Sequence, residues 1–146
     1  MFKVAVTGHR LERIRGREKE IENWLKEQFK NLIACYDDIL LLDGMAEGVD
    51  QMAAYTALKC GVGVSCYFAF KEKMNHAQTY IAKKAVEIQY IDEKYSDQCF
   101  FNRDCRMIDD CDLLIVVWDG KEIGGTYEAY QYAIEKGKNI LIYDWN

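Results

Sequence analysis

Residues 2–10 read FKVAVTGHR, an apolar run that ends in the turn Thr7-Gly8-His9-Arg10. The run Phe2–Val6 is predicted to be a β-strand, and it shows no alternation of apolar and polar residues. Strands of this kind are buried between two layers of helices, as in a parallel sheet. Five similar runs follow: Ile39–Leu42, Val62–Phe68, Val86–Tyr90, Leu113–Trp118 and Ile140–Tyr143.

Segments of helical period separate these runs. In Glu18–Cys35 the apolar residues recur at spacings of three and four, which predicts a helix that docks one stripe on the sheet. That stripe consists of Ile21, Trp24, Leu25, Phe29 and Leu32. Four more helices are predicted, at Glu47–Cys60, His76–Lys84, Cys99–Cys111 and Thr126–Lys136.

The alternation of strands and helices predicts an α/β fold in a single domain, residues 1–146. Its expected form is a three-layer, doubly wound sheet of about six strands, mostly parallel. Open sheets of this type bind ligands beyond the carboxyl ends of their strands. The functional residues are therefore expected in the turns that follow the strands.

The composition bounds the class of protein. The chain has 146 residues, 50% of them hydrophobic, with 19 Lys plus Arg against 24 Asp plus Glu and a net charge of -5. It is too hydrophobic for intrinsic disorder and long enough for a real core. No run approaches the ~20 apolar residues of a membrane span, and no signal-peptide pattern is visible, so a cytoplasmic protein without a membrane partner is expected. The acidic balance argues against nucleic acid as a partner.

The motif search finds no metal or cofactor signature. The sequence contains no HExxH, GxSxG or Walker motif, which excludes zinc hydrolases, serine hydrolases and P-loop proteins. The six cysteines form no CxxC pair and are interpreted as reduced packing residues: Cys35, Cys60, Cys66, Cys99, Cys105 and Cys111. We therefore expect neither a metal ion nor a cofactor.

Glycine-rich turns follow three of the expected strands. They are Thr7-Gly8-His9-Arg10, Gly44-Met45-Ala46-Glu47-Gly48-Val49-Asp50, and Asp119-Gly120 followed by Ile123-Gly124-Gly125-Thr126. Glycine lets backbone N–H groups approach a ligand, and the helix that follows directs its positive end at the same place, so phosphate is the natural occupant. The alternative is that tight turns simply need glycine. Three such turns on one edge favour the binding interpretation.

All six arginines lie in two clusters. The first is Arg10, Arg13, Arg15 and Arg17, and the second is Arg103 and Arg106. The planar guanidinium fork matches phosphate or carboxylate, so these clusters indicate a local anion site. A solvated charged turn remains the alternative for the first cluster, apart from Arg10.

Thr126 is expected at or beside the N-cap of the last helix, where its hydroxyl and open amides lie together. Glu128 follows in the first turn, and a carboxylate there commonly does no more than stabilise the helix dipole. In a pocket it could instead bind ribose hydroxyls or act as an acid or base. The ligand-binding candidates are Thr7, Gly8, His9, Arg10, Gly44, Met45, Ala46, Gly48, Asp50, Asp119, Gly120, Gly124, Gly125 and Thr126.

Taken together, these turns resemble the SLOG superfamily of Rossmann-like domains. The resemblance is carried by the three glycine-rich turns, by Asn102-Arg103 leading to Met107, by Asp112, and by Trp118-Asp119-Gly120. It spans nearly the whole chain and is nearest to the YspA and YpsA-related branch, common in bacteria and their phages. The second turn also resembles the glycine-rich loop of DprA proteins, in which this fold binds DNA.

The same superfamily contains the Lonely Guy phosphoribohydrolases, which cleave the N-glycosidic bond of nucleoside monophosphates. Their catalytic arginine matches Arg103, four residues before Met107. Their PGGxGTxxE loop matches only at Gly125-Thr126, because Ala129 stands where the glutamate is expected and Glu128 lies one residue earlier. The resemblance therefore implies Arg103 and Glu128 as catalytic candidates. It also implies a homo-oligomer, to which the hydrophobic segment Ile140–Trp145 could contribute, although the favoured interpretation of that segment is the last strand.

Three hypotheses follow. The first is a protein that binds a nucleotide or a nucleotide-derived molecule, with a sensing, sequestering or processing role such as SLOG domains have in defence systems. The second is a phosphoribohydrolase-like enzyme that uses Arg103 and Glu128 to cleave the N-glycosidic bond of a nucleoside monophosphate or an ADP-ribose-type signal. The third, a weaker alternative, is DNA-associated work like that of DprA.

Overall fold

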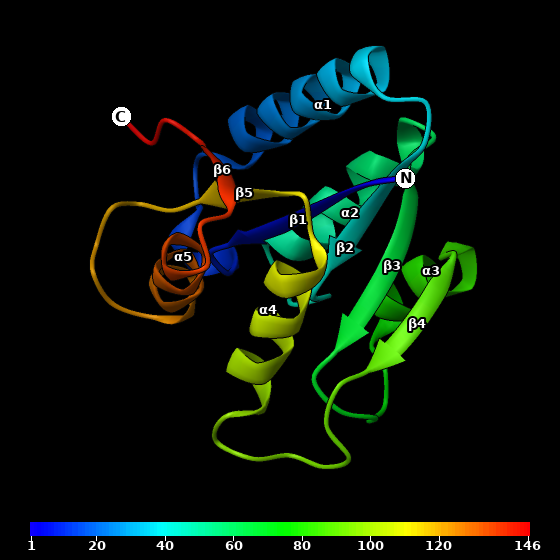
Figure 1. The fold of residues 1–146 in the computed structure, drawn as a ribbon, viewed down its shortest axis with the longest axis vertical. Coiled ribbons are helices and arrows are strands. Elements are labelled where there is room, and N and C mark those ends of the chain that lie inside the picture. Colours follow the sequence, from blue (N-terminus) through cyan, green and yellow to red (C-terminus); the bar gives the residue numbers. More distant parts are fainter.

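Figure 1 shows a central sheet with helices on both faces in the computed structural model, which describes residues 1–146. The strands are β1 (Phe2–Gly8), β2 (Ile39–Asp43), β3 (Gly63–Phe68), β4 (Glu87–Tyr90), β5 (Leu113–Val117) and β6 (Asn139–Ile142). The helices are α1 (Glu18–Cys35), α2 (Val49–Lys59), α3 (His76–Lys84), α4 (Cys99–Asp110) and α5 (Gly125–Glu135), with a short 3₁₀ helix, η1, at Leu11–Arg13.

The sheet has six strands in the order β4-β3-β2-β1-β5-β6, and every neighbouring pair is parallel. From β1 the chain continues to β2 on one side, whereas β5 lies on the other side. The strand order therefore reverses between β1 and β5, and open α/β sheets carry their ligand crevice at such a point. The predicted doubly wound α/β fold is confirmed, and its sheet is entirely rather than mostly parallel.

The core consists of two apolar clusters, one on each face of the sheet. Val4 and Val6 point to the cluster that contains the α1, α2 and α3 residues, whereas Ala5 points to the cluster under α4 and α5. This alternation follows from the two-residue period of a strand. The stripe predicted for α1 is confirmed, since Ile21, Leu25 and Phe29 are completely buried there and Trp24 and Leu32 are partly buried.

The element boundaries differ from the predictions by at most two residues. β1 continues to Gly8, α2 begins at Val49 instead of Glu47, and Asn139–Ile142 forms the last strand. η1 was not predicted, because three residues are too few for a periodic signal. Residues 44–48 form a turn because Met45 has φ of 65° and Gly48 has φ of 105°, which keeps the helix from starting earlier.

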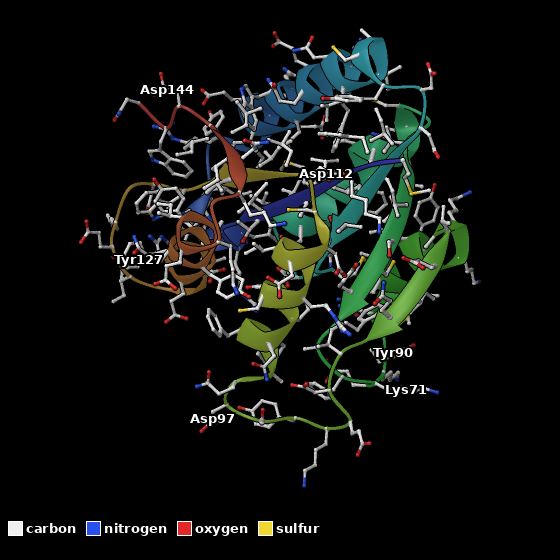
Figure 2. All side chains as sticks on the ribbon, viewed as in Figure 1. Lys71, Tyr90, Asp97, Asp112, Tyr127 and Asp144 are labelled. Atoms are coloured by element: carbon white, nitrogen blue, oxygen red, sulfur yellow. The ribbon has the colours of Figure 1, made fainter.

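The two ends of the sheet carry different residues. Asp112, singled out by the resemblance, lies at the amino end of β5, where its Oδ2 accepts a hydrogen bond from the backbone N–H of Lys3 (2.9 Å). Lys71 follows the carboxyl end of β3 and Tyr90 is the last residue of β4, and both lie far from Asp112 (Figure 2). Asp112 thus belongs to the edge opposite the glycine-rich turns. No helix is long and apolar enough to cross a membrane.

Candidate functional site

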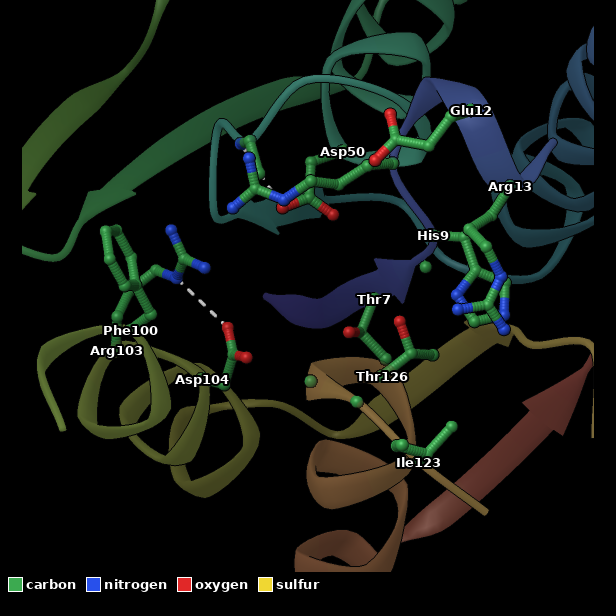
Figure 3. Close-up of a pocket in the computed structure, with 15 residues that line it drawn as sticks. Thr7, His9, Glu12, Arg13, Asp50, Phe100, Arg103, Asp104, Ile123 and Thr126 are labelled. Atoms are coloured by element: carbon green, nitrogen blue, oxygen red, sulfur yellow. Dashed lines mark hydrogen bonds and ion pairs between the residues drawn. The ribbon is translucent and has the colours of Figure 1, made fainter. Parts of the chain in front are cut away.

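A cavity of about 270 Å³ lies beyond the carboxyl ends of β1 and β5, at the reversal of strand order (Figure 3). We call it the central pocket. Its walls come from the turn after β1, the turn after β2, one face of α4 and the start of α5. The lining residues are Thr7, Gly8, His9, Arg10, Glu12, Arg13, Ala46, Asp50, Phe100, Arg103, Asp104, Ile123, Gly124, Gly125 and Thr126.

The turn after β1 is held against the start of α2 by a close backbone approach. The N–H of Val49 donates to the carbonyl of His9 at 3.1 Å. A Cβ on Gly8 would lie 2.6 Å from a methyl group of Val49, and a Cβ on Gly48 would lie 2.6 Å from the carbonyl oxygen of His9. These two glycines are therefore required by packing, which brings the turns after β1 and β2 together.

His9 and Asp119 connect the turns after β1 and β5. The backbone N–H of Asp119 donates to Nε2 of His9 at 3.0 Å, and the same nitrogen lies 3.2 Å from the Oδ1 of Asp119. Burial lowers the pKa of His9 and outweighs the opposing effect of the Asp119 carboxylate. Trp145 packs its ring edge-on against His9, with centroids 5.8 Å apart.

Asp119 acts as an anchor at this junction. Its carboxylate accepts a hydrogen bond from Arg13 and another from the N–H of Lys121. Burial would raise the pKa of Asp119, but these bonds, together with His9, lower it to about 2. Asp119 therefore stays ionised and holds Arg13 at the edge of the central pocket.

Arg103 is a buried charged group that is held by hydrogen bonds on two sides. Only 7% of the residue is exposed, its Nη1 donates to the carbonyl of Gly44 at 2.7 Å, and its Nε donates to Asp104 at 3.0 Å. A Cβ on Gly44 would lie 3.0 Å from the guanidinium carbon, so this glycine makes room for Arg103. Burial alone would lower the pKa of Arg103, but Asp104 and Asp50 raise it, and the group stays charged.

Two further carboxyl groups lie beneath the turn after β2. Asp43 is completely buried; its Oδ1 accepts from the N–H of Met45 at 2.8 Å, and its Oδ2 has no hydrogen-bond partner. Burial and the neighbouring Asp50 raise its pKa well above the ordinary value. Burial also raises the pKa of Asp50 to about 7, against the opposing effect of Arg103.

This raised pKa predicts a pH dependence of stability. Between the ordinary value of about 4 and the folded value of about 7, the folded protein binds more protons than the unfolded chain, so the free energy of unfolding falls as the pH rises through this window. The variant Asp50→Asn lacks this contribution. Its free energy of unfolding is therefore expected to fall less steeply with pH than that of the wild-type protein, by up to about 1.4 kcal/mol per pH unit. Urea denaturation at pH 5, 6, 7 and 8 measures it.

The matched control is Asp97→Asn, in the exposed loop before α4, which should leave the wild-type slope unchanged. The charged groups that act on Asp50 are Arg103, Asp104 and Arg10. Equal slopes for Asp50→Asn and the wild-type protein would contradict the assignment of the proton to Asp50.

The amino end of α5 forms the remaining wall. Gly124 has φ of 98°, and no side chain caps the helix. The first amides of a helix lack partners within it and carry its positive end. Gly125 and Thr126 therefore present backbone donors and one hydroxyl to the central pocket.

The structure brings most of the candidate residues to one edge. Ten of the ligand-binding and catalytic candidates line the central pocket: Thr7, Gly8, His9, Arg10, Ala46, Asp50, Arg103, Gly124, Gly125 and Thr126. Gly44 and Met45 line an adjoining cavity together with Ala46. Gly48, Asp119, Gly120 and Glu128 line neither, and Gly48 and Asp119 instead fix the turns in place.

Glu128 lies in a separate groove between α4 and α5 and is exposed. Ala129, one residue later, is completely buried against the sheet. One residue on a helix is a rotation of about 100°, which separates the two directions. The carboxylates that do line the central pocket are Glu12, Asp50 and Asp104.

Sequence reasoning missed several pocket residues. Glu12, Phe100, Asp104 and Ile123 line the cavity, and Arg13 joins them although it could be interpreted as a solvated turn residue. Asp104 directly follows Arg103 in the sequence, a signal that could have identified it. Glu12, Arg13 and Ile123 depend on the path of η1 and of the loop before α5, for which the sequence holds no periodic pattern.

Comparison with known proteins yields structural matches only, since no protein-family profile and no curated protein matches the chain. DNA processing protein A (DprA) from Streptococcus pneumoniae superposes with a TM-score of 0.72 at 19% identity, over 97% of this chain and 50% of that one. DprA from Helicobacter pylori, described for its single-stranded DNA binding mode, superposes with a TM-score of 0.69 at 19% identity, over 97% of this chain and 64% of that one. TM1055, a structural-genomics target, superposes with a TM-score of 0.66 at 19% identity, over 96% of this chain and 72% of that one.

The chain thus has the Rossmann-like fold of these proteins, which confirms the predicted fold. It spans only about half to two thirds of the length of the two DprA chains. The expectation that nucleic acid is an unlikely partner is wrong, because two structural neighbours are DNA processing proteins. Net charge is a sum over the whole surface and does not report the groups at one pocket, where three arginines lie together with three acids: Arg10, Arg13, Arg103, Glu12, Asp50 and Asp104.

Proposed function

We propose that the central pocket binds a nucleotide or a nucleotide-derived small molecule. The observation that carries this proposal is the convergence of the turns after β1, β2 and β5, and of three arginines, on one cavity at the reversal of strand order. The phosphate would lie on the uncapped amino end of α5, where Gly125 and Thr126 offer backbone donors. Arg10 and Arg103 would neutralise its charge.

The charges of the pocket favour a ligand with more than a phosphate. Three arginines, Arg10, Arg13 and Arg103, are balanced by three acids: Glu12, Asp50 and Asp104. A bare anion would be repelled by these carboxylates, whereas the hydroxyl groups of a ribose can donate hydrogen bonds to them. This combination of guanidinium and carboxylate groups fits a sugar phosphate.

Calorimetric titration with nucleoside monophosphates, ADP-ribose and cyclic ADP-ribose isomers tests the proposal. We expect at least one phosphorylated ligand to bind, and Thr126→Val to weaken it roughly tenfold because a charge-assisted hydrogen bond is removed. The matched control is Thr79→Val on α3, away from the pocket, which should leave affinity unchanged. If every phosphorylated ligand fails to bind, the proposal is overturned.

Chromatography of the same mixtures separates binding from hydrolysis. Release of free base would assign the chain an N-glycosidase activity, for which Arg103 would hold the phosphate. Glu128 lies outside the central pocket, so the carboxyl group nearest to the ligand would be Asp50, Asp104 or Glu12. With a pKa of about 7, Asp50 is suited to hold or release a proton at neutral pH.

Single-stranded DNA is a second candidate ligand, favoured by the two DprA neighbours. A DNA strand presents the same chemistry as a nucleotide, and the aromatic rings of Phe70, Tyr95 and Phe100 gather beside the pocket. Fluorescence anisotropy with a labelled single-stranded oligonucleotide, added to the titration series at physiological salt, distinguishes the two. Binding that a mononucleotide cannot displace would favour DNA.

A further inference from the structure

A second cavity adjoins the central pocket on the side of β2 and β3. It measures about 200 Å³ and is formed by the turn after β2, the end of β3, the first residues of α3 and the start of α4. We call it the side cavity. Four residues line both cavities: Arg10, Ala46, Phe100 and Arg103. One continuous depression therefore extends along the carboxyl edge of the sheet.

Arg103 and Phe100 separate the two cavities. The guanidinium of Arg103 is fixed by Gly44 and Asp104, and its carbon lies 5.6 Å from the centroid of the Phe100 ring. Because Arg103 is almost completely buried and its bonds hold it on two sides, it does not swing away to merge the cavities. A ligand that entered both would have to cross this fixed group.

The two cavities differ in chemistry. Three of the fifteen residues that line the central pocket are hydrophobic, against six of thirteen in the side cavity. The apolar surface includes the phenylalanines Phe68, Phe70 and Phe100. The rings of Phe70 and Phe100 meet edge-on, with their centroids 6.3 Å apart. Such walls accept a planar apolar group.

The polar groups of the side cavity are few and fixed. Gln78 donates to the carbonyl of Met45 at 3.1 Å and accepts from the N–H of Asn75 at 3.0 Å, so both ends of its amide are engaged. Glu47 and Glu72 add two carboxylates, which accept hydrogen bonds. An apolar slot with acceptors at its edge suits a heterocycle that carries N–H groups.

We propose that the ligand spans both cavities, with its phosphate in the central pocket and a nucleobase-like heterocycle in the side cavity, and with its sugar crossing Arg103. This inference rests on the proposed function and specifies its ligand class. The aromatic part then contributes affinity through the walls of the side cavity, above all through Phe70, which lines only that cavity.

The test compares whole and truncated ligands by calorimetry. Ribose 5-phosphate reaches only the central pocket, whereas the four common nucleoside 5'-monophosphates reach both. We expect at least one monophosphate to bind the wild-type protein roughly tenfold more tightly than ribose 5-phosphate. Phe70→Ala should remove most of that difference and leave ribose 5-phosphate unchanged, and Phe70→Leu should retain part of it.

The matched control is Tyr80→Ala, an exposed aromatic residue on α3 that lines neither cavity, which should change neither affinity. Equal affinity of ribose 5-phosphate and all four monophosphates, or an equal loss of both in Phe70→Ala, would overturn the side-cavity assignment and leave the proposed function intact. If neither ribose 5-phosphate nor any monophosphate binds, both proposals fail.

Discussion

Replacing Arg103 with alanine is expected to lower the free energy of unfolding by about 3–5 kcal/mol and to abolish ligand binding. The guanidinium is buried between Asp104, Asp50 and the carbonyl of Gly44, and its removal leaves carboxylates without their countercharge. Breaking a buried ion pair from one side carries a cost of this size. Denaturant unfolding at pH 8 measures it.

The loss of stability in Arg103→Ala should be smaller at pH 5 than at pH 8. Asp50 already has a pKa of about 7, and without the arginine its pKa would rise further, so at low pH the carboxyl becomes neutral and needs no partner. Arg106→Ala is the matched control, because Arg106 lies on the same helix and is exposed. It should change stability by less than about 0.5 kcal/mol. A similar, pH-independent loss in both variants would refute the role assigned to Arg103.

Replacing Gly48 with alanine is expected to cost about 3 kcal/mol. Gly48 has φ of 105°, which L residues rarely adopt, and its Cβ would lie 2.6 Å from the carbonyl oxygen of His9. The strained backbone and the forced displacement of the turn each contribute about 1–3 kcal/mol. Because the clash moves His9, ligand affinity should fall as well. Thermal unfolding and calorimetry measure the two effects.

Gly16→Ala separates the clash from the backbone strain. Gly16 has φ of 84°, similar to that of Gly48, but no atom lies within 4 Å of the position of its Cβ. This variant should lose about 1 kcal/mol and retain the affinity for the ligand. If Gly48→Ala and Gly16→Ala lose equal stability, the close approach of Gly48 to His9 does not contribute to the effect of the Gly48 substitution.

The sequence predicts the fold well because hydrophobic periodicity is a local property. α1 and α3 begin and end at the predicted residues, and every predicted strand overlaps an observed one. The two layers of helices follow from strands that are apolar on both faces, and β1 illustrates this with Val4 and Val6 on one face and Ala5 on the other.

The candidate site was predicted less completely because it depends on direction as well as position. The glycine-rich turns could be placed at the correct edge, since the carboxyl ends of parallel strands meet there. The direction of Glu128, however, depends on a rotation of one residue on α5, and the role of Asp119 depends on the path of Arg13 through η1. Neither can be inferred from a local pattern.

The pairing of β1 with both β2 and β5 has a consequence for biosynthesis. β1 ends at Gly8, yet β5, one of its two hydrogen-bonding partners, begins only at Leu113. A nascent chain therefore holds the central strand with one unpaired edge until β5 has left the ribosome, and unpaired edges recruit foreign strands. Truncated or stalled products should be aggregation-prone and ligand-free.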